Sequence, residues 1–151
     1  MKILIATDGS EYSEYAVKEF CRIYPDLSRL QIKVVSVYEE QYVLAAEPFA
    51  VPAEYYQQMA DAAEKQASHF AATAEKIVRS CKSDGDLDVT VKMMKGPPEK
   101  EIVELAEEWR ADLIVVGSHG RGFWGRMLGS VSDAVVHDAP CSVLVVRKPK
   151  D

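Results

Sequence analysis

A short apolar run that ends in glycine does most to constrain the fold of this chain. Residues 111–116 read Ala-Asp-Leu-Ile-Val-Val, and five glycines follow between positions 117 and 129. An amphipathic run then begins at Ser130. Continuous apolar runs are typical of strands that are covered on both faces, and clustered glycines mark a loop. The sequence therefore predicts a buried strand, a glycine-rich loop and a helix from about Ser130 to Asp138.

The chemistry of this stretch favours an anion. Glycines let backbone N–H groups approach a ligand without interference from a Cβ, and a helix N-terminus adds unpaired donors and the positive end of a dipole. The chain has a net charge of -6, yet residues 113–132 contain no acidic residue and include His119, Arg121 and Arg126. We expect a phosphate group to bind here. The alternative is a glycine-rich surface turn without a ligand.

The remaining chain alternates strand and helix patterns. Strands are predicted at residues 2–7, 30–37, 87–94 and 142–146, and helices are predicted to begin near Ser10, Ala53 and Pro98. Such alternation predicts one α/β domain over residues 1–151, with a parallel sheet and helices on both faces. Ligands of such sheets bind beyond the carboxyl ends of the strands, where the strand order reverses. If the first and fourth strands are neighbours, the turns at Asp8-Gly9 and Gly117 face each other.

Composition excludes several classes of protein. The acidic balance argues against nucleic-acid and anionic-membrane binding. The apolar runs are too short to span a bilayer, and the opening residues suit a first strand better than a signal peptide, so we expect a cytoplasmic protein. Cys21, Cys81 and Cys141 show no C-x-x-C spacing, which argues against a disulfide framework and a zinc site. We expect reduced cysteines packed in or near the core, in preference to a redox role.

The chain lacks two common nucleotide-binding motifs in their usual context. Residues 120–125 match G-x-G-x-x-G by letter, but the dinucleotide fingerprint follows the first strand of its unit and needs an acidic residue about 20 positions on. No G-x-x-x-x-G-K-[ST] motif is present.

His119 lacks an evident carboxylate partner and nucleophile, so we expect a phosphate contact or solvent exposure rather than catalysis. Phe123 and Trp124 could cover a ligand, fill the neighbouring core or form a partner surface.

Taken together, these segments resemble the universal stress protein family over nearly the whole chain. The resemblance rests on residues 3–10 (ILIATDGS), 35–37 (VSV), 96–98 (GPP), 111–117 (ADLIVVG), 129–132 (GSVS) and 139–146 (APCSVLVV). It implies a flavodoxin-like, adenine nucleotide alpha hydrolase-like fold with strand order 3-2-1-4-5. It also implies a homodimer that pairs through the last strand.

The nucleotide-binding branch of that family carries Gly, two residues, Gly, nine residues, Gly, then Ser or Thr. Gly117 and Gly120 match the first half, and Gly129 and Ser130 match the end. Eight residues separate Gly120 from Gly129, so the loop is one residue shorter than the family pattern. One residue spans about 3.5 Å, so the shorter loop has a shorter reach by up to that length. The flexible backbone at Gly122 and Gly125 could compensate for this shorter reach.

The resemblance also implies a set of binding residues. Phosphate contacts fall to backbone N–H groups and hydroxyls, the adenosine contact to a carboxylate, and the adenine contacts to apolar side chains. The implied site comprises Ala6, Asp8, Val37, Val116, Gly117, Gly120, Gly129, Ser130, Val131 and Ser132. For Asp8 the alternative is a turn or cap residue, and for Ser130 it is a plain N-cap. No metal ligand and no catalytic residue is implied.

The implied function is an ATP-binding stress-response protein that acts as a regulatory switch and has at most weak ATPase activity. Whether Mg²⁺ accompanies ATP stays open. One alternative is a dimeric stress protein that binds no nucleotide and works as an interaction module. The other is an enzyme acting on adenine nucleotides, which would need a Ser-Gly-Gly-x-Asp-Ser type of loop where this chain has Asp8-Gly9-Ser10-Glu11.

Overall fold

The computed structural model describes residues 1–39, 52–81, 87–120 and 127–149. Within these residues the predicted alternation of strands and helices is confirmed, with boundaries that differ from the predicted ones by a residue or two. The elements are β1 (Lys2–Ala6), α1 (Glu11–Ile23), β2 (Gln31–Tyr38), α2 (Ala53–Ser80), β3 (Asp88–Lys95), α3 (Pro98–Trp109), β4 (Leu113–Gly117), α4 (Ser130–Asp138) and β5 (Ser142–Val146).

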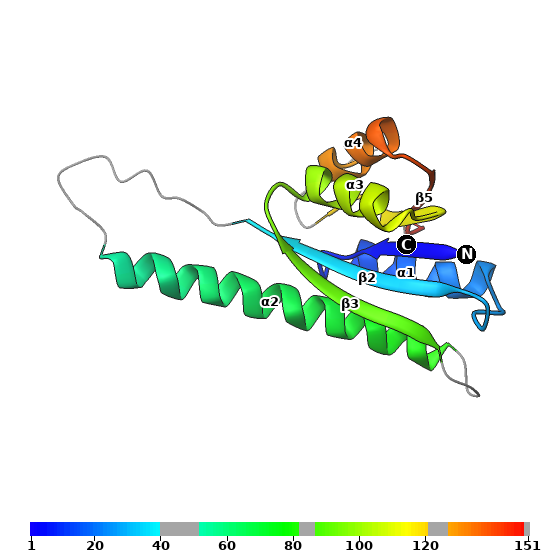
Figure 1. Cartoon of the computed structure of the whole chain (residues 1–151), viewed down its shortest axis with the longest axis horizontal. Helices are drawn as coiled ribbons and strands as arrows, with labels where there is room; N and C mark the ends of the chain where they lie inside the picture. The colour runs from blue at the N-terminus through cyan, green and yellow to red at the C-terminus, as the bar shows by residue number, and fades with distance from the viewer. Residues whose placement is uncertain (40–51, 82–86, 121–126, 150–151) are drawn as a thin grey trace.

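The five strands form one parallel sheet in the order β3-β2-β1-β4-β5, as expected from the family resemblance (Figure 1). β1 and β4 are direct neighbours, with Ile3 opposite Leu113 and Ile5 opposite Val115. The chain leaves β1 toward one edge of the sheet and later returns to the other side at β4. The strand order therefore reverses between β1 and β4, which places the crevice of the fold at their carboxyl ends.

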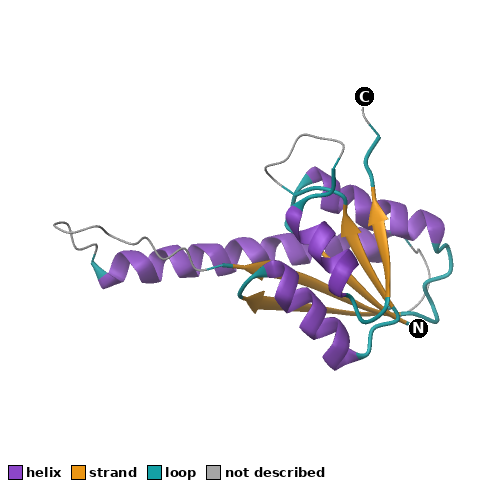
Figure 2. Ribbon diagram, turned by 90° about the horizontal axis from the view of Figure 1, so that it is seen from above, coloured by secondary structure: helices purple, strands orange, loops and turns teal. Residues whose placement is uncertain are grey.

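Two apolar cores lie on opposite faces of the sheet, because successive side chains of a buried strand point to opposite faces. Ile3 and Ile5 of β1 pack with α1 and α2, whereas Leu4 packs with α3 and α4. The uninterrupted apolar run of β1 therefore supplies both cores. α2 extends well beyond the ends of β2 and β3 (Figure 2). None of the described helices is both long and apolar enough to cross a bilayer.

Local signals account for the helix boundaries. Ser10 is the N-cap of α1, and its Oγ accepts a hydrogen bond from the Ser13 N–H at 3.2 Å, as its position predicted. Pro98 opens α3, where a missing N–H costs nothing. The segment between β2 and α2 lies largely outside the described residues, since residues 40–51 are not among them.

The turn between β1 and α1 requires glycine at position 9. Gly9 has φ +70°, and a Cβ there would lie 2.0 Å from Cδ1 of Phe70 on α2. The left-handed backbone and the aromatic ring beneath it both exclude a side chain. Phe70 of α2 thus supports the turn that carries Asp8 to the carboxyl edge of the sheet.

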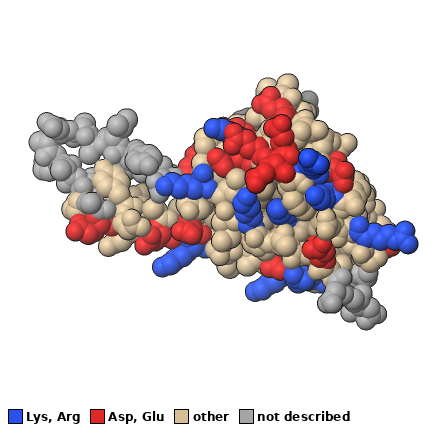
Figure 3. Space-filling model, viewed as in Figure 1, with Lys and Arg blue, Asp and Glu red and all other residues tan. Residues whose placement is uncertain are grey.

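Charge is unevenly distributed over the surface. Acidic side chains gather over α3, and basic side chains lie beside them over the neighbouring strands (Figure 3). The exposed glutamates of α3 include Glu104, Glu107 and Glu108, and Glu101 in its first turn is half-buried. Beside them Lys33 lies 4.4 Å from the ring centroid of Trp109, close enough for a cation–π contact.

The cysteines differ in exposure. Cys21 is buried and Cys141 is half-buried, but Cys81 is exposed at the end of α2. The expectation that all three pack in or near the core is therefore wrong for Cys81. The reason is its place at the C-cap, just after the last residue of the helix.

Candidate functional site

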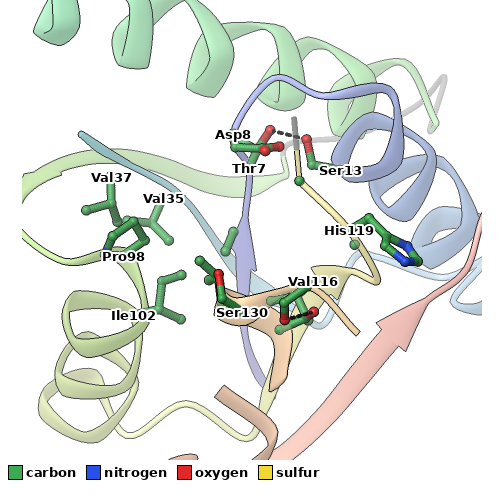
Figure 4. A pocket seen from close by; sticks show the side chains of 16 residues that line it. Thr7, Asp8, Ser13, Val35, Val37, Pro98, Ile102, Val116, His119 and Ser130 are labelled. Carbon is green, nitrogen blue, oxygen red and sulfur yellow. Dashed lines mark hydrogen bonds between the residues drawn. The ribbon is translucent and has the colours of Figure 1, made fainter. Parts of the chain in front are cut away.

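A cavity of about 500 Å³ opens at the carboxyl ends of β1 and β4, where the strand order reverses. Its walls come from β1, β2, β4, α1, α3, α4 and the loops that follow β1 and β4 (Figure 4). Its volume lies in the range typical of small-molecule sites. The ten residues of the predicted site all line this one cavity: Ala6, Asp8, Val37, Val116, Gly117, Gly120, Gly129, Ser130, Val131 and Ser132.

One side of the cavity is apolar. Val35 and Val37 of β2 lie beside Pro98 and Ile102 of α3 in the close-up view (Figure 4). Val116 of β4 is 4% exposed and belongs, with Val35 and Ile102, to the core cluster beneath α3 and α4. The rigid core of the domain thus forms this wall. A flat, apolar group such as a purine base is the kind of ligand that such a slot accommodates.

Another part of the cavity wall offers backbone donors at the start of α4. The N–H of Asp133 donates to the Gly129 carbonyl at 2.9 Å and closes the first helical turn. The N–H groups of Ser130, Val131 and Ser132 precede that bond, so the helix itself supplies them with no carbonyl partner. All three residues line the cavity. This end of α4 therefore presents hydrogen-bond donors and a positive dipole end to a ligand.

The turn after β1 and the loop after β4 face each other, as predicted for neighbouring strands. A Cβ on Gly120 would lie 2.9 Å from Oδ2 of Asp8. The Asp8 carboxylate therefore lies directly against the glycine loop. Its other oxygen, Oδ1, accepts a hydrogen bond from the Ser10 N–H at 3.0 Å and holds the turn. Asp8 thus has a turn-stabilising role in addition to its place on the cavity wall.

Gly117 permits the close approach of β4 to the first turn of α1. A Cβ there would lie 2.9 Å from the carbonyl carbon of Tyr12 and 3.0 Å from the backbone nitrogen of Ser13. These are backbone atoms, which cannot rotate out of the way as a side chain can. The glycine that begins the loop is therefore needed for packing, whatever its role toward a ligand.

Polar residues outside the predicted set also line the cavity. Thr7 Oγ1 and Ser13 Oγ lie 3.1 Å apart, and both side chains are buried. Thr7 Oγ1 also accepts from the Gly9 N–H at 3.2 Å. The sequence signal that could have assigned them to the site is their position, since Thr7 directly follows β1 and Ser13 lies in the first turn of α1. The other lining residues that the sequence did not assign are Val35, Pro98 and Ile102.

Ser132 and His119 take roles that support the loop. Ser132 Oγ lies 3.1 Å from the Ser118 carbonyl and 2.9 Å from the Gly129 carbonyl, so its single hydroxyl proton is used within the protein. His119 Nδ1 lies 2.9 Å from Ser118 Oγ, and its ring stacks at a tilt on Tyr12 with 5.3 Å between centroids. His119 is half-buried and borders the cavity, rather than being exposed. The sequence therefore placed both residues at the site without revealing these supporting contacts.

The family model for the universal stress protein family matches residues 1–147. The chain belongs to the universal stress protein family. A universal stress protein of Methanocaldococcus jannaschii is 36% identical over 151 residues, which cover 99% of this chain and 83% of the relative. The family assignment based on sequence motifs is thereby confirmed.

Solved universal stress protein structures share the fold. One from Lactobacillus plantarum has a TM-score of 0.74 and 24% identity, covering 97% of this chain and 97% of that chain. A universal stress protein crystallised in complex with cAMP has a TM-score of 0.65 and 26% identity, covering 97% of this chain and 96% of that chain. The architecture described here is thus shared with a relative that holds an adenine nucleotide.

Within the described residues, no group of three His, Cys, Asp or Glu side chains could hold a metal ion. Asp8 is the acidic side chain among the residues that line the cavity. Arg121, Phe123, Trp124 and Arg126, which the sequence placed in the glycine loop, lie outside the described residues. The donors described above come from backbone and hydroxyl groups.

Proposed function

We propose that this universal stress protein binds ATP in the cavity between β1 and β4 and acts as a regulatory switch with slow or no hydrolysis. The observation that carries the proposal is that one cavity of about 500 Å³ is lined both by apolar side chains and by the backbone N–H donors at the start of α4. Val35, Val37 and Ile102 offer an apolar slot for a base, and the start of α4 offers N–H donors for phosphates. A nucleotide needs both in one site.

The fit of the site to a nucleotide rests on the glycines as well. A Cβ on Gly120 would lie 2.9 Å from Asp8 Oδ2, so glycine allows the loop and the Asp8 carboxylate to lie close together at the cavity. The cavity contains Asp8 as its acidic side chain, which suits a hydroxyl or amine donor of the adenosine part and would repel a phosphate. If Mg²⁺ binds, its ligands would come mainly from ATP and water.

Calorimetry of nucleotide binding tests the proposal. We expect the wild-type protein to bind ATP, with weaker binding of AMP and cAMP, because the added phosphates reach the donors at α4. Ser130→Ala removes an exposed hydroxyl from the cavity wall and should weaken ATP binding about 5–10-fold. Ser142→Ala, an exposed serine at the start of β5 and outside the cavity, is the matched control.

Two results would count against this function. Absence of heat with every nucleotide would favour the alternative suggested by the short Gly120–Gly129 spacing, a stress protein that works as an interaction module alone. Release of phosphate or pyrophosphate well above a buffer blank, lost in Ser130→Ala, would favour an enzyme on adenine nucleotides instead. The Ser10 N–H donates to Asp8 Oδ1 and closes a tight turn there. This turn differs from the Ser-Gly-Gly-x-Asp-Ser type of loop that such an enzyme would need, so it gives no support to that alternative.

We also propose that the protein is a cytoplasmic homodimer paired through β5. Among the described strands β5 pairs with β4 alone, so its outer edge is open. Val143, Leu144 and Val145 are only half-buried in the single chain, and an open apolar edge favours pairing with another strand.

Hydrogen exchange and sedimentation test the dimer. Sedimentation equilibrium should give twice the mass of the chain, and the amides of β5 should lose protection on dilution to the monomer. β3 is the edge strand at the other side of the sheet and serves as the internal control. A monomer at all concentrations, or dilution-dependent protection in β3 instead, would refute pairing through β5.

A further inference from the structure

A second cavity lies beside the proposed nucleotide site, between the end of β2 and α2. Its volume is about 580 Å³, and it shares Asp8, Val37 and Pro98 with the first cavity. Gly129 and Ser130, at the start of α4, line the first cavity and not the second. The second cavity therefore adjoins the apolar slot and the Asp8 turn, away from the backbone donors of α4.

One face of α2 forms the floor of the second cavity. Met59, Ala63, Ala67 and Phe70 all line it, and their three- and four-residue steps place them on one side of the helix. Ala67 is 3% exposed and Ala71, one turn further on, is fully buried, whereas Ala63 and Met59 are half-buried. This face loses its cover because α2 extends beyond the carboxyl ends of β2 and β3 (Figure 2). The second cavity is thus the part of the groove between helix and sheet that runs past the edge of the sheet.

Small and aromatic side chains give this cavity an apolar space suited to a flat group. Ala63 and Ala67 project only a methyl group from α2, and the ring of Phe70 lines the cavity further along the helix. Tyr38 is the last residue of β2. Strand alternation puts its side chain on the same sheet face as Val34, which packs in the core that includes α2. The cavity therefore offers two aromatic rings and a shallow alanine floor.

The charged side chains that line the second cavity are both carboxylates, Asp8 and Glu39. No Lys, Arg or His is among its described lining residues, and Lys95, which is in register with Tyr38 on β3, lies outside the lining. Asp8 is held in place by the Ser10 N–H, which donates to its Oδ1 at 3.0 Å. Carboxylates and aromatic rings both attract a cation, and the same carboxylates repel a phosphate. The two adjoining cavities therefore favour ligands of opposite charge.

We propose that the second cavity binds a small organic cation, namely a primary amine attached to a flat apolar body. The apolar body packs on Ala63 and Ala67 beside the Phe70 ring. The ammonium group lies at the rim, where the Glu39 carboxylate accepts its hydrogen bonds and Asp8 adds a second negative charge. This site goes beyond the proposed nucleotide function, because its ligand, its floor on α2 and its charge all differ from those of the first cavity.

Three ligands with the same phenylethyl body and different charge test the proposal. The full chain is titrated with 2-phenylethylamine, 2-phenylethanol and 3-phenylpropionate, which are a cation, a neutral alcohol and an anion at neutral pH. We expect the amine to bind with a Kd of about 1 mM, the range that so small a ligand can reach. The alcohol should bind about 5–10-fold more weakly, because it lacks the charge that attracts the carboxylates and rings. The anion should not bind.

Variants of the chain test which groups hold the amine. Glu39→Gln preserves the size of an exposed side chain and should weaken binding of the amine about 3-fold while leaving the alcohol unchanged. Glu104→Gln, at an exposed glutamate of α3 outside both cavities, is the matched control. Ala63→Leu fills the floor and should abolish binding of the amine and the alcohol. Ala60→Leu, at a half-buried alanine of α2 that lines neither cavity, should leave both unchanged.

Methyl NMR locates the bound amine. Its addition should shift the methyl signals of Met59 and Ala63, but not those of Ile102 and Val131, which line only the first cavity. The proposal is overturned if the amine does not bind, if all three ligands bind equally, or if the shifts concentrate at Ile102 and Val131. Unchanged amine binding in Glu39→Gln would also overturn it, and this exposed substitution is readable even if Ala63→Leu does not fold. No measurement here requires a bound nucleotide, so this proposal and ATP binding can fail separately.

Discussion

Gly117→Val is expected to lower the free energy of unfolding by roughly 3 kcal/mol, in the upper range for overpacked sites. The added Cβ would lie 2.9 Å from the Tyr12 carbonyl carbon and 3.0 Å from the Ser13 nitrogen. Both belong to the first turn of α1, which is fixed in place by the Ser10 cap and by burial of Ser13. β4 and α1 must therefore move apart, and the Ser118 N–H bond to Val146, 2.8 Å long, is strained as well.

Urea unfolding measures this effect, and Gly129→Ala is its matched control. A Cβ on Gly129 would lie 3.4 Å from His119 Cα, which is an ordinary contact, and the residue has an extended backbone. Its cost should stay below about 1 kcal/mol, the usual cost of placing alanine at an N-cap. Equal stabilities for the two variants would show that Gly117 is not needed for packing.

Substitution of Gly117 alters packing as well as any ligand contact. Gly117→Val is an obvious choice for blocking a phosphate site, because the residue opens the glycine motif. The structure indicates that the same change displaces β4 from α1, so a loss of binding in that variant would not identify a ligand contact. Ser130→Ala is the cleaner probe, since its side chain is exposed and outside the core.

Asp8→Ala is expected to weaken ATP binding about 10–100-fold, the cost of losing a hydrogen bond to a charged group. This expectation rests on the proposed function. Asp8 Oδ2 lies against the glycine loop, and Oδ1 accepts from the Ser10 N–H at 3.0 Å. Alanine removes both oxygens, so part of the loss would come from a loosened turn.

Asp8→Asn separates the two contributions. Asparagine keeps an oxygen for the Ser10 N–H but removes the negative charge. If the carboxylate accepts from the adenosine part, Asp8→Asn should weaken ATP and adenosine binding by similar factors. If it lies beside the phosphates instead, removal of the charge should strengthen ATP binding and leave adenosine unchanged. Calorimetry with both ligands decides, and a tighter ATP complex would contradict the assignment of Asp8 to the adenosine.

Much of this fold is encoded in local patterns. The apolar runs of β1 and β4 predicted those two strands, because a strand that is buried on both faces needs apolar residues at every position. Ser10 and Pro98 predicted two helix starts, because a cap and a missing N–H act within one turn. The strand order came from the family resemblance, since periodicity alone does not say which strands pair.

The residues of the candidate site were likewise predicted from the sequence only in part. Glycine spacing pointed to Gly117, Gly120 and Gly129, because a loop open to an anion needs backbone without side chains. Thr7, Pro98 and Ile102 were not assigned to the site. Their sequence neighbourhoods give turn, helix-start and core signals, and only the packing of α1 and α3 around the carboxyl edge turns these residues toward one cavity.

The sequence by itself determined where strands and helices lie and which loop is rich in glycine, because those properties depend on residues close together in the chain. The tertiary structure decided which residues meet across the chain. Gly117 proved to be packed on α1, Ser132 bonded to the Ser118 carbonyl, and Phe70 placed beneath Gly9. Such contacts depend on how helices pack on the sheet, and no local pattern specifies that packing.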